Sequence, residues 1–350
     1  MDVRVLVIGG GQAGLAAAYW LKRYTIAHWI VDKGQQVGES WERRYDSLQL
    51  FTPRSYNLLP GMELPGDSEG LPVKDEIAAA LRHYQGEHQL PLTLNSEVVG
   101  VERASGRFRV ETTRGDYTAD AIIVATGPFQ KPLVPPISTE LSTKIRQLHS
   151  NEYRRPGDLK PGVSLVVGGG NSGAQIAVEL SAHGPVMLSA AQPPLFMPLT
   201  IGGKNVFWWL DKLRLLSAPA DSYRGRKIRS RPDPVFGKEL QHHIREGAVT
   251  LKPRTVGVQA GERVQFADGT AARVDNIVWA TGFQSDYGWL HVDGALDQQG
   301  KPLHRRGVSP VAGLYYVGLP WQTSRQSALL RGVGKDAEEI VRHIQAEALL

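Results

Sequence analysis

The sequence predicts an α/β fold that contains two Rossmann-like domains, and three features support this. Two short apolar strands, residues 3–8 and 163–167, each run into a glycine turn of the form G-x-G-x-x-G. Each turn opens a helix, residues 15–24 and 174–182, and a further strand follows each helix. Two Ala-Thr-Gly triplets end later strands in register with the two turns. The chain is therefore a coarse internal repeat.

The first turn predicts a site for FAD. Gly9 permits the tight turn, Gly11 lets the backbone approach a pyrophosphate, and Gly14 allows the helix to pack closely on the strand. Free amides at the helix start attract the anion, and Asp32 at the end of the next strand can accept hydrogen bonds from ribose hydroxyls. A glycine turn without a ligand is the alternative. The residues expected at this site from the turn, the strand end and the first triplet are Gly9, Gly11, Gln12, Ala13, Gly14, Asp32, Lys33, Ala125, Thr126 and Gly127.

The second turn predicts a nicotinamide dinucleotide site with weak selectivity between NADH and NADPH. Its following strand ends in Ser189-Ala190-Ala191-Gln192, which contains neither the acid that favours NAD nor the arginine that grips a 2′-phosphate. Lys204 or the basic residues between Arg224 and Arg231 are alternative sources of charge, although a basic run is usually a solvated surface. The expected contacts are Gly168, Gly170, Asn171, Ser172, Gly173, Ser189, Gln192, Lys204, Ala280, Thr281 and Gly282.

Composition excludes several other classes of protein. The sequence is 41% hydrophobic and 21% charged, which suits a globular chain with two cores. A net charge of +5 over 350 residues does not indicate a nucleic-acid binder. The absence of cysteine excludes disulfides, thiolate metal sites and the redox pair of a flavin disulfide reductase, and no metal site is predicted. Because no apolar run approaches ~20 residues and no signal peptide is visible, we expect no membrane insertion and a cytoplasmic location.

The order of segments predicts an inserted domain. We expect residues 1–155 and 284–350 to form the FAD-binding domain and residues 156–283 to form the NAD(P)H-binding domain. A helix is expected over 74–84 and a last helix over 327–346, whereas 34–71 and 192–237 are expected to be irregular. The apolar run 206–210 is expected either to pack in the interior or to form a lid over the nicotinamide.

The order of these motifs resembles that of class B flavoprotein monooxygenases, which include flavin-containing monooxygenases, plant YUCCA enzymes and small bacterial relatives. The segment from Trp41 to Leu48 looks like the family's flavin-contacting stretch. His149 and Tyr153 keep the spacing of the family fingerprint F-x-G-x-x-x-H-x-x-x-[YF], but Thr143 and Ile145 replace its Phe and Gly. The resemblance places further FAD contacts at Ser40, Trp41, Leu48, Thr52, Gly318 and Gln322.

The resemblance also implies the chemistry. A nicotinamide would reduce FAD, the flavin would form a C4a-(hydro)peroxide with O₂, and one oxygen atom would pass to a small sulfide, amine or ketone. No side chain is assigned as catalytic; the candidates are Phe51, Thr52, Trp321 and Gln322. Phe51 stands where many relatives carry an active-site Asn, so an oxidase or flavin-linked reductase that releases peroxide stays open, as does a non-catalytic dinucleotide sensor. The oligomeric state, possibly a homodimer, and the role of Arg224–Arg231 stay open too.

Overall fold

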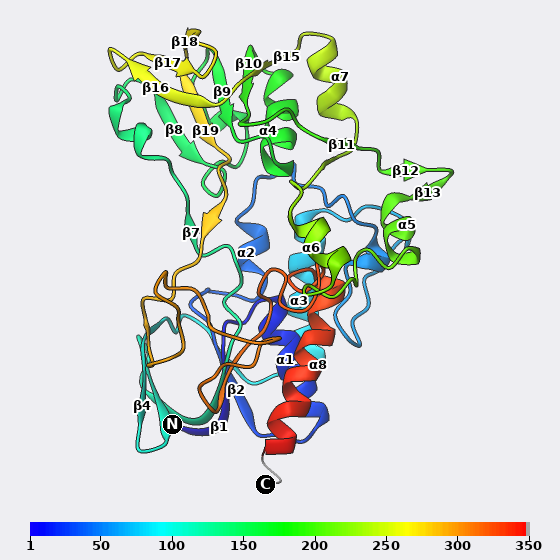
Figure 1. The fold of residues 1–350 in the computed structure, drawn as a ribbon, viewed down its shortest axis with the longest axis vertical. Coiled ribbons are helices and arrows are strands. Elements are labelled where there is room, and N and C mark those ends of the chain that lie inside the picture. The colour runs from blue at the N-terminus through cyan, green and yellow to red at the C-terminus, as the bar shows by residue number, and fades with distance from the viewer. Residues whose placement is uncertain (348–350) are drawn as a thin grey trace.

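A computed structural model describes residues 1–347 and contains two main sheets, one in each half of an elongated molecule (Figure 1). The first sheet runs β21-β4-β5-β6-β1-β2-β3, and β22 also pairs with β6. Its strands are β1 (Asp2–Ile8), β2 (His28–Val31), β3 (Leu92–Thr93), β4 (Val98–Ala104), β5 (Arg107–Thr112), β6 (Tyr117–Val124), β21 (Leu290–His291) and β22 (Leu314–Tyr316). The strands β2, β1, β6 and β22 are parallel, so their carboxyl ends meet at one edge.

Three helices cover one face of this sheet: α1 (Gln12–Arg23), α3 (Lys74–Glu87) and α8 (Leu330–Glu347). Apolar residues at helical spacing in α8, such as Val333, Ala337 and Ile340, are fully buried against α1 and the sheet. The expected helix over 74–84 is confirmed, and the last helix starts three residues later than expected.

The second sheet is entirely parallel, in the order β15-β10-β9-β19-β8. Its strands are β8 (Arg146–His149), β9 (Ser164–Val167), β10 (Val186–Ser189), β15 (Val249–Lys252) and β19 (Asn276–Trp279). The helices α4 (Asn171–Ser181) and α7 (Glu239–Arg245) pack on one face, and an antiparallel layer of β16 (Thr255–Gln259), β17 (Arg263–Phe266) and β18 (Ala271–Arg273) packs on the other. Coverage of both faces explains why the three central strands, β10, β9 and β19, are mostly apolar.

Two chain segments connect the halves side by side. The strand β7 (Lys131–Pro132) pairs antiparallel with β20 (Phe283–Gln284). The strand β8 lies beyond this link and pairs with β19, although residues 1–155 were expected to belong to the first domain. We therefore propose that the domain boundaries lie at the β7–β20 pair, with residues 133–282 forming the inserted unit.

Irregular structure was the wrong prediction for residues 192–237. This segment contains two helices, α5 (Val206–Lys212) and α6 (Tyr223–Arg229), and four short strands. The strands are β11 (Phe196–Met197) paired with β14 (Val235–Phe236), and the hairpin of β12 (Thr200–Ile201) and β13 (Lys204–Asn205), which projects from one side of the molecule (Figure 1). Each helix spans only about two turns, so helical periodicity is weak, and capping fixes their starts: Asn205 accepts from the amide of Phe207 and Ser222 from that of Gly225.

Residues 34–71 hold only short pieces, α2 (Glu39–Glu42) and the 3₁₀ turn Arg54–Tyr56, close to the expected loop. Two further 3₁₀ turns, Pro136–Glu140 and Pro156–Asp158, lie in the connection around β8. No helix among residues 1–347 has the length and apolar character needed to cross a membrane.

Candidate functional site

The two glycine turns have the same geometry. A Cβ on Gly9 would lie 2.7 Å from the carbonyl oxygen of Ala125, and one on Gly168 would lie 2.2 Å from that of Ala280. A side chain at Gly14 or Gly173 would collide with the carbonyl of the first glycine in its own turn, at 1.8 and 1.9 Å. Each Ala-Thr-Gly triplet therefore lies directly over its glycine turn, as the matched repeat suggested.

The middle glycine of each turn faces open space. At both Gly11 and Gly170, the position that a Cβ would occupy has no neighbouring atom within 4 Å, and both residues have ordinary extended backbone angles. Neither α1 nor α4 has a side-chain cap, so the first backbone amides of both helices lack internal acceptors. Open space beside unpaired helix-start amides fits the pyrophosphate of a dinucleotide at both turns.

Asp32 completes the first turn. Its two carboxylate oxygens accept hydrogen bonds from the amides of Gly10, at 2.5 Å, and Gly34, at 2.6 Å. A carboxylate has about four acceptor positions, so the remaining lone pairs are available to ribose hydroxyls. The neighbouring Lys33 is exposed.

The side chains that follow the middle glycines are used to hold the turns. The Gln12 amide donates to the carbonyl of Ala328 at 2.8 Å, just before α8. The Asn171 amide donates to the Pro234 carbonyl at 3.0 Å, and the Asn171 side-chain oxygen accepts from the Phe236 amide at 2.9 Å. Gln12 and Asn171 therefore offer their backbone amides to a ligand, with their side chains already engaged.

At the end of β10, the side chains expected to contact the nicotinamide dinucleotide are not all available to it. The Ser189 hydroxyl is buried, donates to the Pro253 carbonyl at 2.8 Å and accepts from both donors of Thr255. It is therefore committed to the neighbouring strand end, whereas Gln192 is exposed beside the sheet edge. Lys204 lies on the β12–β13 hairpin, which projects away from the start of α4 (Figure 1), so the structure does not bring it to the glycine turn.

The segment 40–50 joins the two halves. Tyr45 is buried in the core of the second unit and donates to Gln175 Oε1 on α4 at 2.8 Å, within reach of the Ser172 hydroxyl. Burial raises the pKa of Tyr45 to about 12, so its phenol stays a neutral donor. Of the expected flavin contacts here, Trp41 packs on the first core, Leu48 packs on the second core, and Ser40 is exposed.

Arg44 occupies the crossing point between the halves. Its guanidinium carbon lies 4.7 Å from the ring centre of Phe129 and 4.9 Å from that of Phe283, and these rings stand shortly after the two Ala-Thr-Gly triplets. No carboxylate of residues 1–347 is within ion-pair distance of this half-buried cation. Cation–π contacts on both sides therefore hold it, and they link both connecting strands to the segment 40–50.

His149 is a structural residue of this crossing. Its Nε2 lies 2.9 Å from the carbonyl of Gly282, and its Nδ1 accepts from the amide of Asn151 at 3.1 Å, which identifies Nε2 as the protonated nitrogen. Burial lowers the pKa of His149, partly offset by the bond to Gly282, so the imidazole stays neutral. Tyr153 donates to Glu179 on α4 at 2.7 Å. These contacts give His149 and Tyr153, the two residues that keep the fingerprint spacing, a structural role between the halves.

A loss of stability below neutral pH is expected from this histidine. An unfolded histidine titrates near pH 6.5, and the folded chain holds the His149 proton less tightly, so stability present above pH 6.5 is lost as the pH falls below it. Thermal unfolding between about pH 7.5 and 5 should show this fall, and His149→Gln should reduce its slope. His183 is exposed, so His183→Gln is the matched control. An unchanged slope in His149→Gln would contradict the assignment, since the partly buried His28 and His304, whose pKa values burial also lowers, would then account for the whole effect.

Phe51 and Thr52 are neighbours in one loop, and their side chains contact different parts of the molecule. The Phe51 ring stacks on Phe236, with centres 4.5 Å apart, and lies 6.0 Å from Phe207 of α5. The Thr52 hydroxyl donates to Oδ1 of the buried Asn57 at 2.9 Å, and Asn57 returns hydrogen bonds to two carbonyls of the loop. Phe51 therefore anchors the segment 196–236 to the first unit, and the nearby amide in this loop, Asn57, is structural.

The turn before α8 contains a strained aromatic residue. Trp321 has φ of +60°, in the left-handed region that side chains seldom adopt, and it follows Gly318, whose position beside Ala13 leaves no room for a Cβ. Such strain costs on the order of 1–3 kcal/mol and is common at ligand sites. The Gln322 side chain is buried and turned inward, with its oxygen 3.3 Å from the Leu319 amide. Trp321 is therefore the stronger candidate for contact with a ligand.

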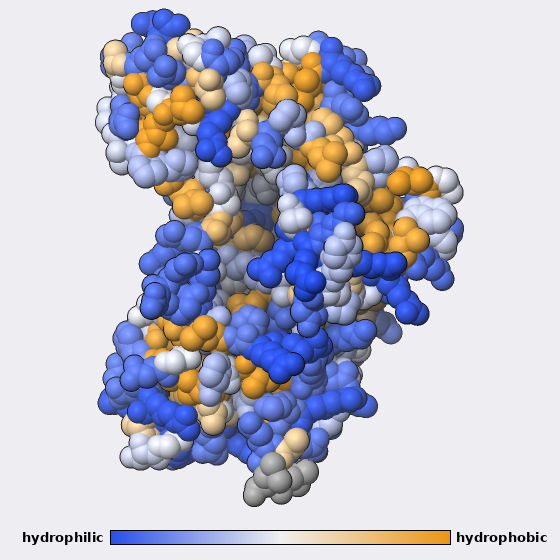
Figure 2. All heavy atoms as spheres, in the orientation of Figure 1, coloured by the Kyte–Doolittle hydropathy of each residue, from blue (hydrophilic) through white to orange (hydrophobic). Residues whose placement is uncertain are grey.

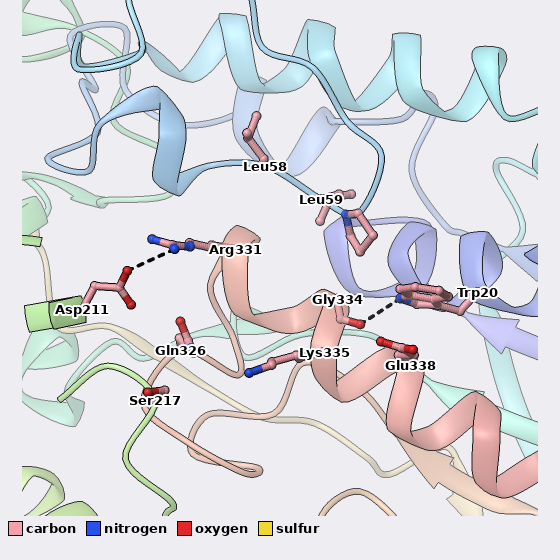
Figure 3. A pocket seen from close by; sticks show the side chains of 11 residues that line it. Trp20, Leu58, Leu59, Asp211, Ser217, Gln326, Arg331, Gly334, Lys335 and Glu338 are labelled. Carbon is pink, nitrogen blue, oxygen red and sulfur yellow. Dashed lines mark hydrogen bonds and ion pairs between the residues drawn. The ribbon is translucent and has the colours of Figure 1, made fainter. Parts of the chain in front are cut away.

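A separate pocket of about 420 Å³ lies between α1, α5 and α8 (Figure 3). Arg331 crosses it, paired with Asp211 of α5 at 3.1 Å and lying 4.2 Å from the ring centre of Tyr56. None of the residues expected to bind a cofactor lines this pocket. The ion pair between Arg331 and Asp211 tethers α5 to the start of α8. Among residues 1–347, no group of three possible metal ligands is found.

Comparison with known proteins identifies the family. Residues 6–192 match the family described as pyridine nucleotide-disulphide oxidoreductase. The chain belongs to this family. It is 50% identical to the CzcO-like oxidoreductase of Geobacillus kaustophilus over 98% of both chains, and 26% identical to the probable indole-3-pyruvate monooxygenase YUCCA3 of Arabidopsis thaliana over 89% of this chain and 81% of that protein. The solved flavin-containing monooxygenase of Stenotrophomonas maltophilia is 28% identical, with a TM-score of 0.83 and 99% of both chains covered.

These likenesses confirm the predicted resemblance to class B flavoprotein monooxygenases and the predicted α/β fold with two Rossmann-like domains. They also confirm that the chain is an enzyme of the flavoprotein oxidoreductase type. The family description includes disulphide chemistry, but this chain has no cysteine to perform it.

The sequence missed several residues that shape the site. Asn57 gave no signal, and Arg44 and Tyr45 were noted only as part of the stretch from Trp41 to Leu48, because their partners lie far along the chain or in irregular loops. Asp336 was also missed: it is buried on α8, accepts from Thr323 beside the Trp321 turn, and has one carboxylate oxygen without a partner among the described residues. Burial raises the pKa of Asp336.

Proposed function

We propose that the protein is an FAD-dependent, NAD(P)H-driven monooxygenase that oxygenates a small soft nucleophile, such as a sulfide or amine, or a ketone. The carrying observation is the duplicated glycine turn, with a carboxylate at the end of the strand beside the first copy and none beside the second. The likeness to flavin monooxygenases supports the class of reaction. O₂ and a small molecule are the proposed substrates.

The first turn would hold FAD. The amides at the start of α1 would bind the pyrophosphate, Asp32 the ribose, and the turn around Trp321 would lie against the ring system. Bound FAD supplies the redox and oxygen chemistry in this class of enzyme. The chain contributes position: Gln12 fixes α1 to the segment before α8, so the pyrophosphate turn and the Trp321 turn form one unit.

The second turn would hold the nicotinamide dinucleotide on the other side of the crossing point. Tyr45, Arg44 and the β7–β20 pair link the two units. These links would hold the second turn at a fixed position relative to the first, so that the nicotinamide would meet the flavin in one geometry. The aromatic cluster of Phe51, Phe207 and Phe236 joins the segment 196–236 to the first unit and would limit the access of water from that side. Productive transfer of oxygen depends on the exclusion of water.

NADH and NADPH are expected to be used with less than about tenfold difference in kcat/KM, since one charge-assisted contact is worth roughly 10- to 150-fold and the end of β10 offers none. The exposed Ala191 allows a designed contrast. Ala191→Arg should raise the preference for NADPH by roughly tenfold or more, because arginine pairs with a 2′-phosphate. A hundredfold NADPH preference in the unmodified protein would show that another base already reaches the phosphate.

Incomplete coupling is the expected behaviour of the unmodified enzyme. By the family resemblance, Phe51 stands roughly where many relatives carry an active-site Asn. Loss of one hydrogen bond to a charged group costs about 1–3 kcal/mol, which would speed peroxide release roughly tenfold. With a saturating aryl methyl sulfide, nicotinamide consumed should therefore exceed sulfoxide formed, with hydrogen peroxide making up the difference. All three quantities are measured in one vessel.

The same measurement separates the proposal from its alternative. Sulfoxide that accounts for part of the nicotinamide supports a monooxygenase. Peroxide without any sulfoxide, amine oxide or ester product would instead establish an NAD(P)H oxidase, which the Phe51 substitution favours. Complete coupling would show that Phe51 has no effect on oxygen transfer.

A further inference from the structure

The segment 200–235 carries a charge surplus equal to the whole net charge of the chain. It contains eight basic and three acidic side chains, a surplus of five, and the formal charge of all 350 residues is also +5. The basic side chains are Lys204, Lys212, Arg214, Arg224, Arg226, Lys227, Arg229 and Arg231. All eight are exposed, and none forms an ion pair within residues 1–347.

The acidic side chains of this segment do not neutralise it. Asp211 pairs with Arg331 of α8, and Asp233 pairs with Arg325 at 2.7 Å, so arginines from outside the segment occupy two of the three. Only Asp221 is left to offset the eight bases. A surface with so little local counter-charge produces a strong positive field that favours an extended anionic partner.

Exposed apolar side chains lie next to these bases. Ile201, Trp209 and Leu213 are 45%, 37% and 58% exposed, and Trp209 donates from its indole to the Ile201 carbonyl at 2.9 Å, which joins hairpin and helix. Figure 2 shows apolar residues gathered over β12, β13 and α5, beside a strongly hydrophilic area over α6. The other face of α5 is already buried through Val206 and Phe207, so packing of the core does not account for the exposed face.

We propose that this basic and apolar surface, the 200–231 face, docks the protein onto an anionic lipid bilayer. Tryptophan and aliphatic side chains beside lysine and arginine are the combination that binds the interface of such membranes without spanning them. A second copy of this chain would bring the same positive charge against itself in a twofold dimer. A nucleic acid would use the bases but leave the aliphatic cluster exposed to water.

Flotation with lipid vesicles tests the docking. The FAD-loaded protein should float with vesicles of phosphatidylglycerol and phosphatidylcholine, remain free with phosphatidylcholine alone, and be released by about 0.5 M salt, which screens the attraction. Arg226→Glu with Lys227→Glu should weaken binding roughly 25-fold or more, since each base near such a surface contributes about fivefold. Lys238→Glu with Arg245→Glu, a matched pair of exposed bases on and beside α7, should leave it unchanged.

A second variant tests the apolar part independently. Trp209→Ser with Leu213→Ser should weaken binding to anionic vesicles and reduce the quenching of tryptophan fluorescence by brominated lipid. Both pairs are exposed, so unchanged melting temperatures will show that the variants fold. Equal binding to neutral vesicles, or an equal effect of the Lys238 and Arg245 pair, would overturn the proposal. So would salt-sensitive binding to duplex DNA without vesicle binding, or dimerisation in the absence of lipid that the serine variant abolishes.

Discussion

Gly11→Leu should give a folded protein that has lost its yellow flavin. The open space around Gly11 and its ordinary backbone angles let the fold accept a side chain, but a leucine there would occupy the space assigned to the pyrophosphate. Loss of two charge-assisted hydrogen bonds, each about 1.5–3 kcal/mol, would weaken FAD binding by roughly 10² to 10⁴. Absorbance of the flavin in the visible range against protein concentration measures the occupancy.

Gly86→Leu is the matched control, because Gly86 lies in α3 and its Cβ position is equally open. It should keep its flavin. By contrast, Gly14→Ala should lower stability as well as occupancy, because its Cβ would lie 1.8 Å from the Gly9 carbonyl. Full occupancy in a folded Gly11→Leu protein would refute the assignment of this turn to FAD.

Gly170→Leu should produce the opposite phenotype, a yellow protein that nicotinamide no longer reduces. Gly170 has the same open surroundings as Gly11, so the fold should persist and the first site should be untouched. The affinity for NADPH and NADH should fall by roughly 10² or more, by the same loss of backbone contacts. The rate of reduction is measured by mixing the protein with NADPH under anaerobic conditions and recording the loss of flavin absorbance.

Dithionite provides the internal control for that experiment, because it reduces flavin without using the second site. Rapid bleaching by dithionite together with slow bleaching by NADPH would place the defect at the second turn. Equal rates of reduction by NADPH in Gly170→Leu and the unmodified protein would mean that the dinucleotide binds elsewhere.

The repeated strand, turn and helix were predictable because they depend on local chemistry. Apolar runs, glycines at fixed spacing and an acid at a strand end specify backbone geometry within about 30 residues, and the structure shows that geometry twice. The sequence even indicated the pairing of each triplet with its turn, because both copies carry the same three small residues. The contacts of individual residues with FAD and with the nicotinamide dinucleotide stay predictions.

Other features depend on partners that no local pattern reveals. Phe51 stacks on Phe236, which lies in a distant part of the chain, so its packing role was invisible in the loop. Ser189 had the right position for a ribose contact, but Pro253 and Thr255, where the chain passes from β15 to β16, occupy its hydroxyl. The short helices α5 and α6 were missed because two turns are too short to show a helical period: α5 is an almost unbroken apolar run, and α6 is mostly basic.

The burial of Tyr45 in the opposite core bears on how the chain folds. This residue belongs by sequence to the first unit but completes the hydrophobic cluster around Leu148, Val166 and Ala177 of the second. The inserted unit produced alone would lack the Tyr45 side chain, and this would leave a cavity in that hydrophobic cluster. The two halves should therefore melt in a single cooperative transition, and a genetic cut at the β7–β20 link should yield an aggregating fragment.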